Sequence, residues 1–480
     1  MWIRRVMAWV LCGAAAGGAA RAAGHAGEDW AVHFNLPDQT TSATSLWTNE
    51  YAIRDALLAR IEALGSGDWA CLSTFTFSGN SASAGAAGPI LAAASNALAR
   101  GAKLGFVVDN GVNVTSNYWP GVSLGSLAAR PGNALELARA PAGSGIMHNK
   151  VGVFWHGAAG QAWVLAGSWN FTGGASSQQW NIFTEIQNNA LGGAYSNELR
   201  ELLSGRFHSN PAKSHAHDRT PFRLAGMDRD GWVRFAPYPD GKYGGTNALT
   251  DIVNAIDSAQ EEVFFALNKL TRAGVVEALI RACNRGVVVH GVIPKSDRGS
   301  PGQDSYEMYQ LLRHSTNYAT RNRARMYEAY YNAARTRRDN NNRDLVHAKY
   351  MLIDPRGANP LVIQGSANWT ASALVLTSSN DENVQFLPHR GIAEAFLAQF
   401  AAMTDGLEPW CALRPAGGGA WLDYWLPETN AHELVFTDDV AGPASAWTNR
   451  AQLLPAGRGT HAVPVALDAP RRFFRLRPAP

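Results

Sequence analysis

The chain is poor in cysteine and lacks long hydrophobic runs beyond its first residues. It has four cysteines in 480 residues, and three of them, Cys71, Cys283 and Cys411, lie far apart without C-x-x-C spacing. This odd number and wide spacing argue against a disulfide framework or a zinc site. Cys283 lies in an apolar, helix-like run and is expected to pack as a small hydrophobic residue. After the N-terminus no segment approaches the roughly 18 uninterrupted apolar residues of a transmembrane helix.

The first residues, MWIRRVMAWVLCGAAAGGAARAAG, have the pattern of a secretory signal peptide. Arg4 and Arg5 precede a short apolar run, and small residues suited to cleavage follow near Ala22. We therefore expect residues 1–23 to be removed and the protein to be secreted or periplasmic. The whole chain has 42 Lys and Arg against 39 Asp and Glu, and residues 1–23 hold three Arg and no acidic residue, which leaves 39 of each. A net charge near zero argues against a protein that coats a polyanion with its whole surface.

The same order of predicted elements occurs twice. Each half opens with a short strand that ends at proline and continues with a helix that has apolar residues at three- and four-residue intervals. A β-rich run, a second helix and an Arg-Gly turn leading into another strand follow. In the first half these segments are 32–37, 51–64, 69–77, 89–99 and 100–110; in the second they are 233–239, 248–259, 261–270, 275–284 and 285–297. Alternating strands and helices indicate an α/β fold with a mixed or parallel sheet covered by helices.

The composition divides the chain into three parts after the signal segment. We predict a first lobe over 24–215 and a second over 216–410, separated by a polar, proline-containing stretch at 208–222. A small all-β accessory module is expected over 415–480, where β-like runs alternate with Gly/Pro turns. The expected assembly is a monomer with an internal pseudo-two-fold axis.

A polar motif closes each half. "MHNKVGVFWHGAAGQAWVLAGSWNFT" (147–172) and "VHAKYMLIDPRGANPLVIQGSANWT" (346–370) both place a His and a Lys two residues apart, which puts them on one face of a strand. A Gly-Ser-x-Asn stretch follows on a neighbouring strand, where glycine permits close approach of a ligand or of backbone. A Glu lies 15 and 14 residues after the respective Asn. The two sets are His148, Lys150, Gly167, Ser168, Asn170 and Glu185, and His347, Lys349, Gly365, Ser366, Asn368 and Glu382.

Two such sets that face each other form a cationic pocket suited to a phosphate. The lysines neutralise the phosphate oxygens and the asparagines donate hydrogen bonds to them. One His attacks phosphorus in line, while the opposite His, when protonated, donates to the leaving oxygen. The two Glu are expected to set the imidazole tautomers by accepting from their second ring nitrogens. This scheme requires no metal or other cofactor, and the sequence shows no carboxylate cluster that would hold a metal.

The duplicated H-x-K…G-S-x-N motif resembles the phospholipase D superfamily, in particular its members with two lobes in one chain. The resemblance extends over about residues 30–405. It implies hydrolysis of a phosphodiester through a covalent phosphohistidine, at one active site between two phospholipase D-like lobes that form a pseudodimer. By analogy with two-lobed members, His148 is the nucleophile and His347 the acid, although the residues alone leave this order open. The family pattern also has an Asp seven residues after the His. Asp354 fits and is interpreted as structural support, whereas the first half has Trp155 at that place.

The resemblance leaves the substrate open. Hydrolysis of a phospholipid headgroup, with peripheral contact to a membrane surface, is the activity for which the superfamily is named. The alternative is a nuclease, because an aromatic residue and a Thr follow each motif Asn, as in the nuclease and cardiolipin-hydrolase members. A third reading is an inactive anion-binding protein, for which Trp155 is the argument.

A basic run rich in tyrosine leads into the second motif. Between Arg313 and Lys349 there are nine Lys and Arg against three acidic residues, and the tyrosines from Tyr327 onward have helical spacing. Arg335, Arg337 and Arg338 in this run are candidates for contact with nucleic-acid phosphates or an anionic membrane surface. A solvated helix that packs its tyrosines on the second lobe is the alternative.

Overall fold

The computed structural model of the chain divides it into two compact units, Met1–Phe400 and Ala401–Pro480. The segment interpreted as a signal peptide lies outside the described residues. The residues that the structure describes are 25–35, 51–81, 85–118, 121–143, 145–208, 210, 219–237, 247–294, 324–329, 345–375, 380–404, 410–416, 419–426, 432–437, 449–454, 459–465 and 473–478.

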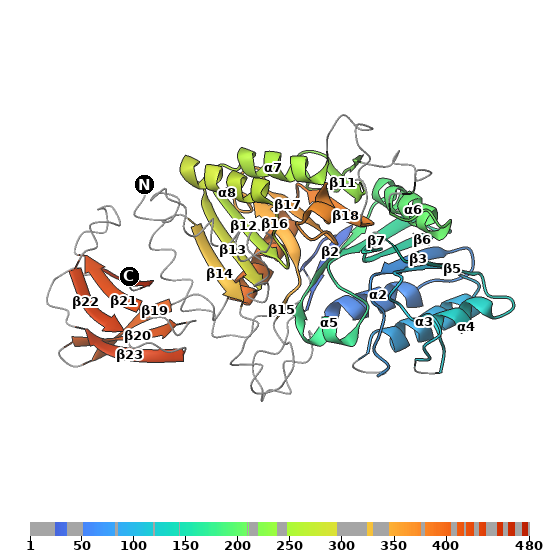
Figure 1. The fold of residues 1–480 in the computed structure, drawn as a ribbon, viewed down its shortest axis with the longest axis horizontal. Coiled ribbons are helices and arrows are strands. Elements are labelled where there is room, and N and C mark those ends of the chain that lie inside the picture. Colours follow the sequence, from blue (N-terminus) through green and yellow to red (C-terminus); the bar gives the residue numbers. More distant parts are fainter. Residues whose placement is uncertain are drawn as a thin grey trace. The chain divides into compact units, whose positions relative to one another are not determined.

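The first half of the larger unit is built on an eight-stranded mixed sheet with the order β1-β2-β9-β7-β6-β3-β4-β5 (Figure 1). β3 pairs in parallel with β4, and β4 with β5, while the other neighbours are antiparallel. The strands are β1 (His25–Ala26), β2 (Trp30–Phe34), β3 (Trp69–Thr74), β4 (Lys103–Val108), β5 (Leu135–Arg139), β6 (Val151–His156), β7 (Gln161–Gly167) and β9 (Ile182–Gln187).

The second half repeats this sheet strand for strand, in the order β10-β11-β18-β17-β16-β12-β13-β14. The parallel pairs fall at the same places, β12 with β13 and β13 with β14. The α/β class and the two lobes expected from the sequence are therefore confirmed. We call β1 to α6 the first lobe and β10 to α13 the second lobe. The strands are β10 (Thr220–Phe222), β11 (Gly231–Ala236), β12 (Glu262–Leu267), β13 (Val288–Pro294), β14 (Ala324–Ala329), β16 (Lys349–Ile353), β17 (Leu361–Gly365) and β18 (Glu382–Leu387).

Helices cover the sheets. α2 packs with α3 on the first sheet and α7 with α8 on the second, where Figure 1 shows both helices along one face. α6 packs against β7 and also contacts β10 and β11 of the second lobe. The helices are α2 (Ala52–Glu62), α3 (Ala87–Ala99), α4 (Leu124–Ala129), α5 (Gly173–Ser177), α6 (Asn189–Leu203), α7 (Ala248–Ser258), α8 (Ala273–Arg285), α12 (Ala371–Leu374) and α13 (Arg390–Thr404).

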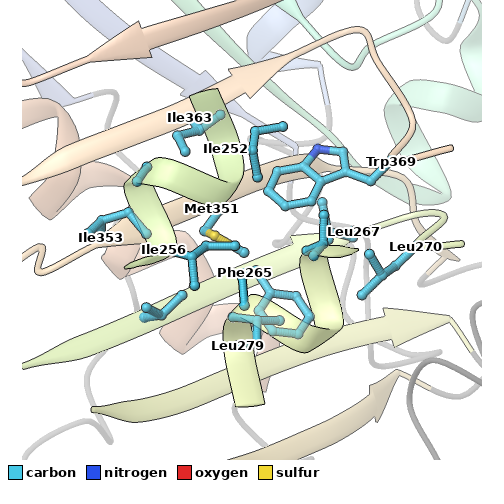
Figure 2. Close-up of a cluster of buried hydrophobic side chains, with 14 of the residues drawn as sticks. Ile252, Ile256, Phe265, Leu267, Leu270, Leu279, Met351, Ile353, Ile363 and Trp369 are labelled. Atoms are coloured by element: carbon cyan, nitrogen blue, oxygen red, sulfur yellow. The ribbon is translucent and has the colours of Figure 1, made fainter. Parts of the chain in front are cut away.

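The apolar periodicity of α7 and α8 produces the core of the second lobe. Figure 2 shows Ile252 and Ile256 of α7 and Leu279 of α8 clustered with Phe265 and Met351 of the sheet. The side chain of Cys283 lies in the same cluster with no exposed surface, as expected for a small hydrophobic residue. α8 ends at Gly286, whose φ of 107° is a left-handed conformation that glycine adopts without strain. This rigid layer supports the strands that carry the second polar motif.

The two lobes exchange backbone hydrogen bonds just before each motif. β15 (Leu345–Val346), which leads into the second motif, pairs in parallel with β8 (Gln179–Trp180) of the first lobe. In the same way Met147 of the first lobe forms a parallel bridge with Asp381 of the second. Each motif is therefore anchored on the opposite lobe.

A buried polar layer also joins the lobes. The Tyr195 hydroxyl donates to Asn383 Oδ1 and accepts from Gln385 Nε2, both at 2.9 Å. Thr184 Oγ1 donates to Gln385 Oε1 at 2.9 Å, and Asn383 Nδ2 donates to Asn149 Oδ1 at 2.7 Å. Because buried polar groups must find partners with correct geometry, these bonds select one docking arrangement of the lobes.

One prediction from the sequence fails here. The helical spacing of the tyrosine-rich run does not correspond to a helix at its start, because Ala324–Ala329 form β14. This strand pairs in parallel with β13, from Val289 opposite Ala324 to Pro294 opposite Ala329, and takes the place that β5 has in the first sheet. Pairing with a buried strand therefore overrides the local spacing. Arg335, Arg337 and Arg338 lie outside the described residues.

From Trp410 onward the described residues of the smaller unit are strands in two antiparallel sheets. In the ranges given above, no helix is both long and apolar enough to cross a membrane. One sheet contains β19 (Trp410–Ala416), β20 (Gly419–Leu426) and β23 (Gly459–Val465), and the other contains β22 (Asn449–Leu454), β21 (His432–Thr437) and β24 (Phe473–Pro478).

Candidate active site

The first motif lies where the two lobes meet. The His148 amide donates to the Asp381 carbonyl of the second lobe at 3.0 Å. One residue earlier, the Met147 amide donates to Asp109 Oδ2 at 2.9 Å, and Asp109 directly follows β4. β6 begins only at Val151, so His148 and Lys150 precede the strand rather than lie on its face as the sequence suggested. The backbone of this segment bonds to Asp381 of the other lobe at Ile146 and His148, and returns to its own sheet at Lys150, whose carbonyl accepts from the Gly167 amide at 3.3 Å.

The second motif has the mirrored arrangement. The His347 amide donates to the Trp180 carbonyl of the first lobe at 3.1 Å. On its other side, Asn268 donates through its backbone to Ala348 O at 2.9 Å and through Nδ2 to Val346 O at 3.0 Å. The two His-x-Lys segments are therefore related by the pseudo-two-fold axis but are fixed by different side chains, Asp109 in one case and Asn268 in the other.

The imidazole of His148 contacts a carboxylate of the opposite lobe. His148 Nδ1 lies 2.7 and 2.9 Å from the two oxygens of Glu382, which is fully buried. Ser366 Oγ donates to Glu382 Oε2 at 2.6 Å and Asn380 Nδ2 donates to Oε1 at 3.1 Å. Glu382 is thus fixed by its own lobe and orients the His of the other, so that Nε2 of His148 is left for a ligand.

Glu185 does not have the corresponding role for His347, which corrects the prediction from the sequence. Its oxygens accept from His33 Nε2 at 2.6 Å and Arg60 Nε at 2.5 Å within the first lobe. His347 Nδ1 instead lies 2.9 Å from Asn181 Oδ1. Glu185 lies four residues after Asn181. This separation corresponds to about 13 Å along β9.

Backbone bonds show that Asn181 is the counterpart of Glu382. The Ser168 amide donates to Ile182 O at 3.0 Å, and the Ser366 amide donates to Asn383 O at 3.1 Å. The residue before each acceptor is Asn181 in one lobe and Glu382 in the other. Ser168 Oγ also donates to Asn181 Oδ1 at 2.9 Å, as Ser366 Oγ does to Glu382. Sequence reasoning missed Asn181.

The remaining motif residues divide into two kinds. Asn170 and Asn368 follow the ends of β7 and β17, and among the described residues each has a buried Oδ1 without a hydrogen-bond partner. The Oδ1 atoms of both asparagines are therefore not used by the fold. Gly167 and Gly365 serve the fold instead: an added Cβ would lie 2.0 Å from Ile182 O and 2.1 Å from Asn383 O.

Asp354 has a structural role, and in the first lobe a different carboxylate, that of Asp68, accepts hydrogen bonds from loop amides. The Asp354 carboxylate accepts from the amides of residues 260, 261 and 262 at 2.8, 2.8 and 2.9 Å, and so ties the start of β12 to the end of β16. In the first lobe Asp68 accepts from Gly65 N and Gly157 N, both at 2.9 Å. Trp155 donates to Ser196 Oγ of α6 at 2.8 Å, near the end of β6 away from His148. The absence of the motif Asp therefore leaves the pocket intact.

A comparison with known protein families identifies a domain in the second half of the chain. Residues 252–404, which include His347, Lys349, Asn368 and Glu382, match the family model described as "Cardiolipin synthase, PLD-like domain". This part of the chain, which forms most of the second lobe, is therefore a phospholipase D-like domain. No curated protein sequence matches it.

Several solved structures are similar to this chain. Polyphosphate kinase from Porphyromonas gingivalis has 13% identity and a TM-score of 0.47, over 79% of this chain and 51% of the kinase. The yeast tyrosyl-DNA phosphodiesterase has 11% identity and a TM-score of 0.40, over 75% of this chain and 90% of that one. Nuc from Salmonella typhimurium, described as a phospholipase D family member, has 24% identity and a TM-score of 0.26, over 36% and 93%. The chain thus spans about half the length of the kinase.

Each lobe brings one buried lysine to the site, Lys150 from the first and Lys349 from the second. Lys150 Nζ donates to His148 O and Lys349 Nζ to His347 O, each at 2.7 Å. Burial lowers the pKa of Lys150 to about 7, against the opposing effect of Glu382 and Asp109. Burial and the neighbouring Lys150 hold the pKa of Lys349 well below its usual value. The negative charge of a bound phosphate would oppose this effect and raise the pKa of both lysines.

The pKa values of the two imidazoles are also lowered. Burial lowers the pKa of His148 to about 4, although Glu382 acts to raise it. Burial, Lys349, Lys150 and His148 hold the pKa of His347 well below the usual range. Burial opposes ionisation of Glu382, but His148, Lys150 and Ser366 outweigh it and lower its pKa. The site thus presents an uncharged His148 beside an ionised Glu382. Within the described ranges, no three His, Cys, Asp or Glu side chains are grouped as metal ligands.

Proposed function

We propose that the protein is a phosphodiesterase that acts through a covalent phosphohistidine, with His148 as the nucleophile. The observation that carries this proposal is the difference between the imidazole partners, a carboxylate of Glu382 for His148 and an amide of Asn181 for His347. A phosphorylated imidazole carries positive charge, which an ionised carboxylate at Nδ1 stabilises. His347 lacks such a partner, so its protonated form is more acidic and gives up its proton more easily.

The proposed reaction has two steps. His148 Nε2 attacks phosphorus, the bond to the leaving oxygen breaks, and that oxygen takes a proton from His347. His347, now neutral, accepts a proton from water as this water attacks the phosphohistidine and the P–N bond breaks. Lys150 and Lys349 neutralise the non-bridging oxygens, and Asn170 and Asn368 donate to them. None of these steps draws on a metal ion.

For the substrate we propose a phospholipid headgroup ester, with a nucleic-acid strand as the competing class. The aromatic residues after each motif Asn, which resemble nuclease members, are Phe171 and Trp369, and both are buried in the lobe cores. They support the fold and do not read the substrate. Incubation in parallel with phosphatidylcholine vesicles, cardiolipin vesicles and single-stranded DNA, all in EDTA, tests the assignment. Hydrolysis of DNA alone would favour the nuclease, and hydrolysis of none of them would contradict the proposed function.

The covalent intermediate is directly observable. After rapid quenching of a reaction with phosphorus-labelled substrate, we expect protein-bound label that is stable in alkali and labile in acid, as a phosphoramidate is. We also expect full activity in EDTA, since the nucleophile is an imidazole. Loss of activity in EDTA that a divalent ion restores would refute this mechanism.

The pH dependence of activity should follow from the lowered pKa of His347. His347 must be protonated to act as an acid, and in the free site its pKa lies well below 6.5. Raising the pH removes this proton, so kcat/KM should fall along an alkaline limb centred below pH 6.5. The limb of kcat should lie at higher pH, because the negative charge of bound substrate raises the pKa of His347. Complete pH–rate profiles of both parameters check this; a limb of kcat/KM above pH 6.5 would contradict the assignment of His347 as the acid.

A further inference from the structure

The lobes differ at the rim of the catalytic pocket, in the residues that follow β3 and β12. Parallel bridges join Phe77 to Phe171 in the first lobe and Leu270 to Trp369 in the second. These bridges make the loops equivalent, so that Phe75 corresponds to Asn268 and the next residue, Thr76, to Lys269. The pseudo-two-fold axis therefore relates an aromatic rim to a cationic one.

Lys269 lies between the two catalytic segments of the second lobe. Its carbonyl accepts from the Trp369 amide at 3.0 Å, directly after Asn368. The preceding residue, Asn268, is bonded to Val346 and Ala348 on either side of His347. Lys269 itself is exposed. After burial and Lys150, its charge is a further cause of the low pKa of Lys349, opposed by Glu382. The backbone of Lys269 is therefore fixed beside His347 and Asn368, and the residue is exposed at the rim of the site.

The first-lobe rim has a different chemistry. The Phe75 ring lies edge-on to the His148 imidazole, with ring centroids 5.1 Å apart and an interplanar angle of 66°. Lys150 Nζ lies 5.6 Å from the centre of the same ring. Phe75 is half-buried, so the surface beside the nucleophile is apolar and carries no additional charge.

We propose that Lys269 forms a second anion subsite, which binds a phosphate carried by the leaving group of the substrate. The inference rests on the proposed function, because in-line attack by His148 directs the leaving group towards His347 and hence towards the rim with Lys269. The substrate class is an ester with a second phosphate next to the scissile one, in a fixed direction. The part of the substrate retained on His148 faces Phe75 and needs no charge.

Paired esters test the subsite. For a nucleic-acid source the probes are the thymidine dinucleotides TpT, pTpT and TpTp, and for a lipid source they are vesicles of phosphatidylglycerol and of phosphatidylglycerol phosphate. For the class that is hydrolysed, we expect kcat/KM to rise about five- to tenfold when the extra phosphate is on the leaving alcohol, as for one additional charge-assisted contact. The products show which alcohol left. No hydrolysis of TpT or phosphatidylglycerol would contradict the proposed function itself, whereas hydrolysis without any preference would contradict only the subsite.

Variants assign the preference to Lys269. Lys269→Gln should reduce the ratio of kcat/KM with and without the second phosphate to about one, while Lys269→Arg should keep it. Lys103→Gln is the matched control, because Lys103 is an exposed lysine at the start of β4, and it should keep the wild-type ratio. Thr76→Lys places a cation on the opposite rim and should create a preference for a phosphate on the retained part. A wild-type ratio in Lys269→Gln would overturn the proposal.

Discussion

Replacing either His148 or His347 by alanine should reduce the turnover of an unactivated phosphodiester by roughly 10³-fold or more, because one site uses both groups. General acid catalysis alone typically contributes about 10²- to 10⁴-fold, and loss of the nucleophile removes the covalent route altogether. Steady-state turnover of each purified variant measures the effect. His156→Ala is a matched control, because His156 pairs with Asp68 on the first lobe and should be dispensable.

The nature of the leaving group separates the two roles. A p-nitrophenyl ester leaves without protonation, so the His347→Ala variant should recover most of its formation of the intermediate on this substrate, whereas His148→Ala should not. The burst of p-nitrophenol in the first turnover measures this step. Recovery in His148→Ala instead would reverse the assignment of nucleophile and acid. Substantial activity of either variant on the unactivated ester would contradict a single site shared by the two lobes.

Glu382→Gln should have the second largest effect, a loss of kcat on the order of 10²-fold or more even with a good leaving group. The substitution keeps the size of the side chain but removes the charge that stabilises phosphorylated His148. Single-turnover measurement of phosphohistidine formation reports this step, and thermal unfolding checks that the variant is folded.

Glu185→Gln supplies the matched control. Both residues are buried carboxylates on or at the start of equivalent strands, but Glu185 pairs with His33 and Arg60. We expect this variant to lose stability and to keep kcat. Equal losses of kcat in the two variants would restore the symmetric role of the carboxylates that the sequence suggested.

The fold could be predicted to the level of element order. Apolar spacing located α2 and α7 within a few residues, and the Arg-Gly turns located the starts of β4 and β13, because each reflects local chemistry. β14 could not be predicted, because its identity depends on pairing with β13 and not on its own pattern of side chains. The exchange of bonds between the lobes also has no local signal.

Of the site, only the residues of the two repeated motifs could be predicted from the sequence. His148, Lys150, His347 and Lys349 have fixed spacing in the sequence, and the structure brings them to one pocket. The partner of His347 was missed, because Asn181 lies 11 residues after Asn170 whereas Glu382 lies 14 after Asn368. The register of β9 and β18 establishes their equivalence, because Asn181 directly precedes β9 and Glu382 is the first residue of β18. The usable signal in the sequence was a polar residue at the start of an apolar strand.

The bonds from His148 to Asp381 and from His347 to Trp180 also determine when the protein becomes competent during folding. His148 and Glu382 are 234 positions apart in the chain, so their contact closes a very long loop. The contacts within each lobe close shorter loops and are expected to form earlier, since the entropic cost of closure grows with loop length. Catalytic competence therefore arises at the docking of two largely formed lobes. A nascent chain that has completed its first lobe holds His148 in place on one side only, and it remains inert until the second lobe has been synthesised and docked.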